Sequence, residues 1–388
     1  MLAWAQVISA SSVSKLRLVA MNLLDVGLII AGLVLLIAGG EALVRGAGTL
    51  ASRAGISPLV IGLVVVSAAT SAPEFAVNIG AILSGEPDLA VGNVVGSNIV
   101  NILFILGLSA VISPLVIKRQ LVRFDIPVMV GVSILLLAVS VDGSISFLDG
   151  VLLLGALAIH TVISIRMGSK EIVDPAAKPV TMPLNSNPVP LWLAILLLVA
   201  GIGLLVGGAQ LLVTGAVSIA TSLGVSSLVI GLTVVAVGTS LPELATSIIA
   251  LLRGETDMAV GNIVGSNIFN IGMVLGLPAM LFGQGIPVAP AAVAIDIPLM
   301  LATAVALLPV AFTGFVVRRW EGSMFVLLYI SYTLYLVLAS TQHDAAEGFS
   351  TIMLWFVLPL VAVTLIAVTS YEMGILKERR AAKLAKVS

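Results

Sequence analysis

Two stretches of this chain carry nearly the same sequence, and together they decide its fold. The first, Ser57–Ala110, reads SPLVIGLVVVSAATSAPEFAVNIGAILSGEPDLAVGNVVGSNIVNILFILGLSA. The second, Ser226–Ala279, reads SSLVIGLTVVAVGTSLPELATSIIALLRGETDMAVGNIVGSNIFNIGMVLGLPA. Aligned at a constant offset without gaps, about 34 of 54 positions are identical, well above chance for two apolar segments. The chain is therefore built from one unit that is used twice.

The composition indicates that most of the chain lies in a membrane. Of the 388 residues, 60% are hydrophobic and only 10% are charged, whereas a soluble domain carries about 25% charged residues. About eleven apolar runs reach the ~20 residues that a membrane-spanning helix needs. They lie near residues 23–48, 57–84, 88–113, 124–141, 146–166, 190–222, 226–252, 258–283, 288–313, 322–340 and 350–371. We therefore expect the lipid bilayer to surround this chain.

Several other classes of protein are excluded by what the sequence lacks. It has no cysteine, which excludes disulfides, thiolate metal sites and thiol catalysis. It has no basic stripe and only 5% aromatic residues, so we expect no nucleic-acid partner. The sequence shows no nucleophile–base pair and no zinc-binding helix that would indicate an enzyme. Nothing in it indicates a cofactor or an obligatory protein partner.

The repeat predicts an all-α membrane protein with two inverted five-helix repeats, which form a ten-helix core, and an additional C-terminal transmembrane helix. An odd number of spans per repeat makes the second repeat enter the membrane from the opposite side, and such repeats bind their substrate near the midplane. The predicted segments are a leader or disordered N-terminus (1–21), the first repeat (22–167), a cytoplasmic linker (168–189), the second repeat (190–341), the extra span (349–372) and a basic cytoplasmic tail (373–388).

Basic residues in the loops orient the predicted spans. With the N-terminus outside, the cytoplasmic loops and tail carry Arg53, Lys118, Arg119, Arg123, Arg166, Lys170, Lys178, Arg253, Arg318, Arg319, Lys377, Arg379, Arg380, Lys383 and Lys386. The external loops carry no Lys or Arg beyond the leader. Because basic loops stay on the cytoplasmic side, we expect a multi-pass protein of the cell (inner) membrane with its C-terminus in the cytoplasm.

Each repeat carries a Thr-Ser-X-Pro-Glu motif in the middle of a span. The motif residues are Thr70, Ser71, Pro73 and Glu74 in the first repeat and Thr239, Ser240, Pro242 and Glu243 in the second. Proline removes a backbone donor and clashes with the preceding turn, so we expect each helix to break and to free carbonyl groups near Ser67 and Ala236. Such carbonyls, the hydroxyls and a carboxylate form an oxygen-only ligand set, which suits hard cations such as Ca²⁺ and Na⁺.

The two motif glutamates indicate transport. A carboxylate within the bilayer is costly and is a functional-site hypothesis by default. No Lys or Arg lies in a central span to pair with Glu74 or Glu243, and the inverted repeat would bring the two carboxylates together, where they repel each other. A divalent cation, two protons or two or more sodium ions would neutralise them. An empty, charged site could not easily reorient, which favours an exchange mechanism.

A second motif, GNVVGSNIVNI in the first repeat and GNIVGSNIFNI in the second, supplies neutral oxygen atoms. Ser97 and Asn101 are four residues apart, as are Ser266 and Asn270, which places each hydroxyl and amide on one helix face. We expect these faces to look toward the glutamates. The remaining asparagines of the motif, Asn93, Asn98, Asn262 and Asn267, fit helix packing better than ligation. Asp125 and Asp296 are expected to cap helix N-termini, and His160 is expected to serve packing.

The motifs GTSLPEL at Gly238–Leu244 and GNIVGSNIFNI at Gly261–Ile271 closely match a known signature. With them, nearly all of residues 22–340 resembles the cation/calcium antiporter superfamily, specifically prokaryotic sodium/calcium exchangers with ten core helices. The resemblance implies ion binding by side chains or carbonyl groups of the residues Glu74, Glu243, Thr70, Thr239, Ser71, Ser240, Ser67, Ala236, Ser97, Asn101, Ser266 and Asn270. Some relatives, among them potassium-dependent ones, carry Asp at the position of Asn270, which argues against potassium coupling.

The resemblance implies a secondary antiporter that exchanges Ca²⁺ for Na⁺ by alternating access and extrudes calcium, with spans one and six sliding across the other eight. H⁺/Ca²⁺ antiport remains the alternative, because neighbouring glutamates can titrate. A cation channel is disfavoured, because the sequence shows no ring of pore-lining charges around a two-carboxylate site.

Overall fold

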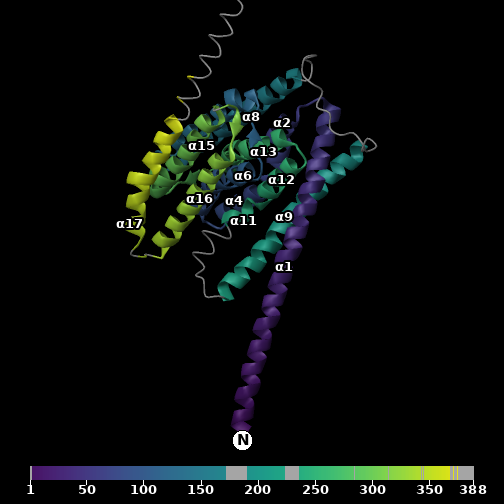
Figure 1. The fold of residues 1–388 in the computed structure, drawn as a ribbon, viewed down its shortest axis with the longest axis vertical. Coiled ribbons are helices and arrows are strands. Elements are labelled where there is room, and N and C mark those ends of the chain that lie inside the picture. The colour runs from purple at the N-terminus through teal and green to yellow at the C-terminus, as the bar shows by residue number, and fades with distance from the viewer. Residues whose placement is uncertain are drawn as a thin grey trace, which may run out of the picture.

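The structure is a bundle of helices from which one long N-terminal helix projects (Figure 1). This computed structural model describes residues 2–171, 190–222, 236–283, 285–312, 314–341, 343, 345–367, 370 and 374. Within these residues the backbone is almost entirely helical, and its strands, β1 to β4, are two residues long each. The all-α fold predicted from the sequence is therefore confirmed.

The elements follow one another along the chain in the order expected for two repeats, with η marking a π-helical segment. The first half holds α1 (Leu2–Ala54), α2 (Pro58–Val60), η1 (Ile61–Val66), α3 (Ser67–Thr70), α4 (Ala72–Leu83), α5 (Pro87–Ile99), η2 (Val100–Leu106), α6 (Gly107–Ile112), β1 (Leu115–Val116), η3 (Leu121–Asp125), α7 (Ile126–Val139), β2 (Ser144–Ile145) and α8 (Phe147–Glu171). The second half holds α9 (Leu191–Ser222), α11 (Ala236–Thr239), α12 (Leu241–Leu252), α13 (Thr256–Phe269), η5 (Asn270–Leu275), α14 (Gly276–Leu281), β3 (Ile286–Pro287), η6 (Ala292–Asp296), α15 (Ile297–Phe312), β4 (Val316–Val317), α16 (Arg319–Ser340), α17 (Ala345–Ile352) and η7 (Met353–Val357).

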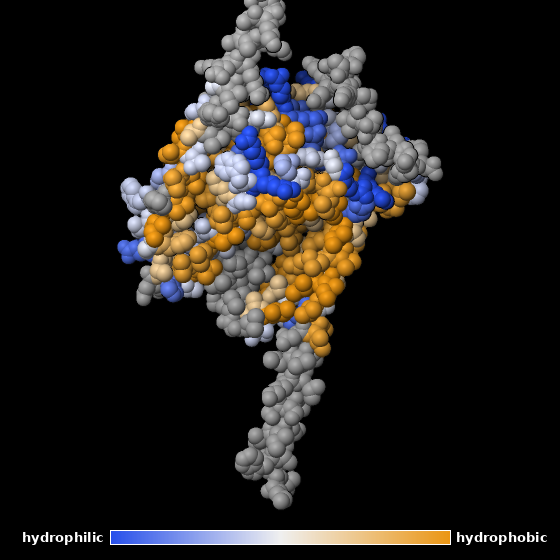
Figure 2. All heavy atoms as spheres, viewed as in Figure 1, coloured by the Kyte–Doolittle hydropathy of each residue, from blue (hydrophilic) through white to orange (hydrophobic). Residues whose placement is uncertain are grey.

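Among the described residues, ten helical stretches are long and apolar enough to cross a membrane. They agree with the predicted spans, including the additional C-terminal one at Ala345–Ala367. The seventh predicted span appears as the shorter apolar helix Leu241–Leu252, because residues 223–235 lie outside the described part of the chain. Figure 2 shows a broad hydrophobic surface across the middle of the bundle, with hydrophilic side chains gathered toward one end. This is the surface expected of a multi-pass membrane protein.

Two segment boundaries differ from the sequence-based prediction. α1 begins at Leu2, so the backbone of the predicted leader continues the helix of the first span. α8 runs through Glu171, so the fifth span extends into the predicted linker. The rest of that linker, residues 172–189, and most of the basic tail lie outside the described residues.

Two small antiparallel sheets relate the halves of the chain to each other. β1, between the third and fourth spans, pairs with β4, between the ninth and tenth. β2, between the fourth and fifth spans, pairs with β3, between the eighth and ninth. If both repeats had the same orientation, the loops paired in each sheet would lie on opposite sides of the membrane. The pairing is therefore the one expected of inverted repeats.

The long helices α1 and α9 form a crossing pair at one side of the bundle (Figure 1). Glycines let their backbones approach: a Cβ atom added to Gly32 would lie 2.7 Å from the carbonyl oxygen of Gly208. A Cβ atom on Gly39 would lie 2.9 Å from the carbonyl oxygen of Gly201. In the constant offset of the repeat, Gly201 is the equivalent of Gly32 and Gly208 that of Gly39. The contact is thus the same when the two halves are exchanged.

The eighth span lies at the centre of the bundle. In α13 every residue from Met258 to Phe269 is buried, and the helix packs against η1, α2 and α3 of the first repeat. Gly261 and Gly62 permit this close packing, because a Cβ atom on either would meet backbone atoms of the other helix at less than ordinary contact distance. The core of the protein is therefore the interface between its two repeats.

Candidate functional site

The second and seventh spans are broken where the sequence predicts it. Ser71 (φ −81°, ψ 3°) separates α3 from α4, and Ser240 (φ −91°, ψ 10°) separates α11 from α12. Pro73 then falls in the first turn of α4, where a missing N–H leaves no helical hydrogen bond unmade. The breaks place Glu74 and Glu243 in the first turns of α4 and α12, where the helix dipole stabilises a negative charge.

Both carboxylates lie deep in the bundle. The side chains of Glu74 and Glu243 are 0% exposed, and their oxygen atoms have no hydrogen-bond partner in the described part of the chain. Their charges interact across the site. The hydroxyl groups of Thr70 and Ser71 lie beside the Glu243 carboxylate, although neither forms a hydrogen bond to it of good geometry. The two repeats thus bring their acidic groups together in a space shared with hydroxyl groups.

Other oxygen atoms of the predicted ligand set are also buried without a partner among the described residues. These atoms are Ser71 Oγ, Ser97 Oγ, Asn101 Oδ1, Ser240 Oγ and Asn270 Oδ1. A buried polar group without a partner costs about 1–3 kcal/mol, so a set of them indicates that a ligand completes the site. Among the described residues, no three His, Cys, Asp or Glu side chains are grouped so that they could hold a metal ion. A cation bound here would therefore take most of its ligands from neutral oxygen atoms.

Each helix that carries a motif glutamate packs against the segment of the opposite repeat that carries an asparagine of the predicted ligand set. α4, which carries Glu74, packs against η5, which begins at Asn270. α12, which carries Glu243, packs against η2, which contains Asn101. Two of the remaining predicted ligands touch directly, because the hydroxyl oxygens of Thr70 and Ser266 lie 3.4 Å apart. Thr239 and Ser97 lie on α11 and α5, which pack against each other.

One expectation about the backbone is wrong. The sequence predicts that the break frees the carbonyl group of Ser67, but the N–H of Ser71 donates a hydrogen bond to it at 2.9 Å. The turn at Ser71 is tight enough to preserve this bond, and Pro73 removes only a donor that the first turn of α4 does not use. The hydroxyl group of Thr70 also donates to the Ser67 carbonyl oxygen, at 3.4 Å. Of Ala236, the structure describes only the backbone, at the start of α11.

Two asparagines expected to serve packing brace the glutamate helices. Asn93 donates to the side chain of Asn78 at 2.7 Å and to the carbonyl oxygen of Glu74 at 3.4 Å. In the second repeat, Asn262 donates to Ser247 at 3.0 Å, and Ser247 is the equivalent of Asn78. Each repeat thus ties its broken span to the following span by the same side-chain bond.

The structure shows a buried polar cluster in the fourth and fifth spans that the sequence does not predict. Asp125 does not cap a helix N-terminus through its side chain. Its Oδ1 lies 2.9 Å from His160 Nε2 and accepts a hydrogen bond of 3.0 Å from Ser164 Oγ. Phe124 stacks on the imidazole ring with a centroid distance of 5.8 Å. His160, expected to serve packing, therefore joins two helices through a carboxylate.

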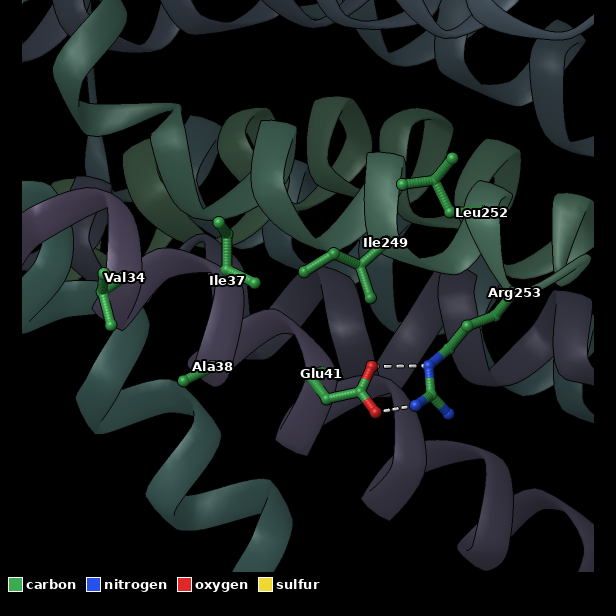
Figure 3. Close-up of a pocket in the computed structure, with 7 residues that line it drawn as sticks. All are labelled: Val34, Ile37, Ala38, Glu41, Ile249, Leu252 and Arg253. Carbon is green, nitrogen blue, oxygen red and sulfur yellow. Dashed lines mark hydrogen bonds and ion pairs between the residues drawn. The ribbon is translucent and has the colours of Figure 1, made fainter. Parts of the chain in front are cut away.

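The structure also shows an ion pair on the surface of the bundle that the sequence does not predict. Glu41 of α1 accepts a hydrogen bond of 2.6 Å from Arg253 Nε and forms a second contact with the same guanidinium group. Arg45 lies 3.0 Å from the same carboxylate. Figure 3 shows the pair closing one end of an apolar groove between α1 and α12, which is lined by Val34, Ile37, Ala38, Ile249 and Leu252. The pair fastens α1 to the seventh span.

Two broken spans from oppositely oriented repeats, meeting at a buried carboxylate pair, define a membrane transporter of the antiporter class rather than an enzyme. The chain belongs to the sodium/calcium exchanger protein family, whose sequence model matches residues 24–166 and 193–338.

Individual relatives agree with this membership. The chain is 39% identical over 314 residues to the putative antiporter CaxA of Alkalimonas amylolytica, covering 80% of this chain and 98% of that protein. It is 29% identical over 338 residues to the sodium/calcium exchanger MaX1 of Methanosarcina acetivorans, covering 79% and 96%. Among solved structures it resembles the sodium–calcium exchanger NCX_Mj soaked with 10 mM Na⁺ and zero Ca²⁺, with a TM-score of 0.68 and 33% identity, covering 80% and 97%. The family suggested by the sequence motifs is therefore confirmed.

Proposed function

We propose that this protein exchanges Ca²⁺ for Na⁺ across the membrane, and that the ions bind between Glu74 and Glu243. The observation that carries the proposal is the pair of fully buried carboxylates, which have neither a hydrogen-bond partner nor a basic partner among the described residues. The names of the matching family and of the relative MaX1 support the same two ions.

The chemistry of the site favours hard cations. Calcium takes six to eight oxygen ligands from carboxylates, carbonyl groups, amides and hydroxyls. The proposed ligands are the two glutamates together with the side chains of Thr70, Ser71, Ser97, Asn101, Thr239, Ser240, Ser266 and Asn270 and the carbonyl groups of Ser67 and Ala236. One Ca²⁺ neutralises two carboxylates, and so do two Na⁺ ions. When one kind of ion leaves, the two carboxylates repel each other until the other kind of ion binds.

The exchange would proceed by alternating access. Inverted repeats around a midplane site permit two states that differ by movement of one group of helices against the rest. The crossing pair α1–α9 is the natural moving group, because it lies at one side of the bundle and is joined internally by close glycine contacts. A cavity that carries two bare carboxylates would not cross the low-dielectric barrier empty, which couples the two fluxes.

We further propose that the protein lies in the inner membrane with its N-terminus outside, and that it extrudes calcium. Support for this orientation comes from the loops that hold Lys118, Arg119, Arg318 and Arg319, because β1 and β4 bring them to the same side of the bundle and basic loops remain in the cytoplasm. Proton-coupled calcium exchange is the second candidate, because two interacting carboxylates can share protons.

Flux into proteoliposomes tests the proposal. Vesicles loaded with Na⁺ and diluted into K⁺ medium should take up ⁴⁵Ca²⁺, whereas vesicles with K⁺ on both sides should not. Vesicles containing Glu243→Gln protein are the matched control for leak. Uptake that follows an imposed pH gradient without Na⁺ would instead establish proton coupling. Uptake that needs no counter-ion would contradict exchange altogether.

A further inference from the structure

Asn98, a buried residue of α5, connects the first repeat to the proposed ligand Asn270. Its Nδ2 atom donates a hydrogen bond of 3.2 Å to the backbone carbonyl oxygen of Asn267. Its Oδ1 atom accepts a hydrogen bond of 3.1 Å from Nδ2 of Asn270. Asn98 and Asn270 are 1% and 0% exposed, so water does not compete for these bonds.

The donor and acceptor chemistry fixes the orientation of both amides. A backbone carbonyl oxygen can only accept a hydrogen bond, so Asn98 must present its NH₂ group to Asn267. Its oxygen then faces Asn270, and an oxygen can only accept. Asn270 must therefore turn its own NH₂ group toward Asn98. The side-chain oxygen of Asn270 is left on the far side of the amide, where it is buried without a partner in the described chain.

That free oxygen atom belongs to the interface that holds Glu74. Asn78, one helical turn after Glu74, donates to the carbonyl oxygen of Val274 at 3.2 Å, and Val274 lies one turn after Asn270. Residues four apart on a helix share a face, and the second and eighth spans run in the same direction through a pair of inverted repeats. Glu74 and Asn270 therefore lie at the same level of the α4–η5 interface.

We propose that Asn98 is a positioning residue, which holds the Asn270 side chain so that its oxygen atom, rather than its NH₂ group, faces the transported cation. The inference rests on the proposed function, since it requires that Asn270 ligates an ion. Without Asn98, the NH₂ group of Asn270 loses its acceptor. The amide can then turn this donor toward the cation, because its oxygen and nitrogen ends are nearly the same shape.

The equivalent position in the other repeat does not do this. Asn267 corresponds to Asn98, but its Nδ2 donates to the carbonyl oxygen of Ile263 in its own helix at 2.7 Å. Asn101, the equivalent of Asn270, has no hydrogen-bond partner on either side-chain atom within the described residues. One asparagine ligand is therefore oriented before the ion arrives and the other is not. This difference supplies a matched control inside the same molecule.

The test measures equilibrium ⁴⁵Ca²⁺ binding to the purified full-length protein in detergent, together with its thermal unfolding. Removal of a group that orients a metal ligand typically weakens metal binding about 10- to 100-fold. Asn98→Leu should cause a loss of this size, whereas Asn267→Leu should change the affinity less than about threefold. Asn98→Ser, which cannot reach both partners, is the second variant in case the leucine variant does not fold, and it should lose affinity likewise.

A double-mutant cycle separates positioning from packing. If Asn98 acts through Asn270, its replacement should weaken Ca²⁺ binding in the native background but not in an Asn270→Ala background. A purely structural role would lower the unfolding temperature and leave the affinity unchanged, which would overturn the inference. Equal losses for the Asn98 and Asn267 variants would also overturn it. Failure of the proposed function looks different, because the wild-type protein would then bind no Ca²⁺ that depends on Glu74 and Glu243.

Discussion

Glu41 and Arg253 form an ion pair that has no possible counterpart in the other half of the protein. In the constant offset of the repeat, Glu41 corresponds to Gln210 and Arg253 to Ser84. Arg253 caps the C-terminus of α12, just as Ser84 caps the C-terminus of α4. α1 packs against α12, but among the described residues α9 makes no comparable contact with α4. The structure is thus one of two arrangements that inverted repeats permit, and the ion pair is present in this one.

Loss of this pair should shift the balance between the two access states. Exchange of the conformations of the repeats would separate α1 from α12 and bring α9 to α4, where Gln210 and Ser84 cannot form an ion pair. A half-exposed pair of this kind contributes about 0.5–1 kcal/mol, so Glu41→Gln should reduce the ratio of the observed state to the other roughly two- to fivefold. Distances between spin labels on α1 and α12 measure this ratio.

A shift in the same direction should follow from building the missing pair in the other half. The double variant Gln210→Glu with Ser84→Arg places an ion pair between α9 and α4, where only the other state would use it. The label distances should then move in the direction expected for Glu41→Gln, and the combined variant of all three positions should move further. A double variant that favours the observed state instead would contradict the assignment.

Neutralising either motif glutamate should abolish exchange. Glu74→Gln and Glu243→Gln each remove one of two charges that bind the cargo, while the amide keeps the shape of the side chain. Because a buried carboxylate without a partner destabilises the empty protein, we expect both variants to unfold at the same temperature as the wild type or higher. Sodium-driven ⁴⁵Ca²⁺ uptake and thermal unfolding are measured on the same preparations. Retained uptake by both variants would remove these residues from the site.

The broken spans and most of the oxygen atoms of the site could be predicted because their causes are local. A proline acts on its own helical turn. A glutamate within an apolar span costs free energy whatever the arrangement of the surrounding helices. Both recur in register at Pro73 and Pro242 and at Glu74 and Glu243, and an odd number of spans per repeat then implies that the two halves meet. The Ser67 carbonyl was predicted wrongly, because the geometry of a single turn at Ser71 decides which hydrogen bonds survive.

The contacts that could not be predicted join side chains far apart in sequence. Asp125 and His160 are 35 residues apart, Asn98 and Asn270 are 172 apart, and Glu41 and Arg253 are 212 apart. Each contact depends on how one helix is rotated about its axis relative to another. An almost uniformly apolar span has no apolar periodicity from which this rotation could be predicted. Neither His160 nor Glu41 has a like counterpart in the other repeat, so the repeat gives no signal for them.

The Asp125 cluster should contribute to stability rather than to ion selectivity. Asp125→Leu removes the acceptor that His160 and Ser164 share and leaves these two groups only their 3.2 Å contact with each other. The loss of a buried acceptor costs about 1–3 kcal/mol. Asp125→Asn keeps one acceptor oxygen, so it should cost less. The unfolding midpoint in detergent measures both, and Asp88→Asn, at an exposed carboxylate, is the control. An Asp125→Leu protein as stable as the control would show that the cluster contributes little.

The close glycine contacts between α1 and α9 should be required for a high rate of transport. A Cβ atom on Gly201 would lie 2.7 Å from the backbone nitrogen of Leu43 and 2.9 Å from the carbonyl oxygen of Gly39, whereas one on Gly203 would meet nothing within 4 Å. Gly201→Ala must therefore separate the two helices, and Gly203→Ala on the same helix need not. If the pair moves as one unit, Gly201→Ala should lower the uptake rate at least about tenfold, since a misplacement of ~1 Å can be this costly. Gly203→Ala should keep the wild-type rate. Equal rates for both variants would show that the exchanger does not require the close crossing.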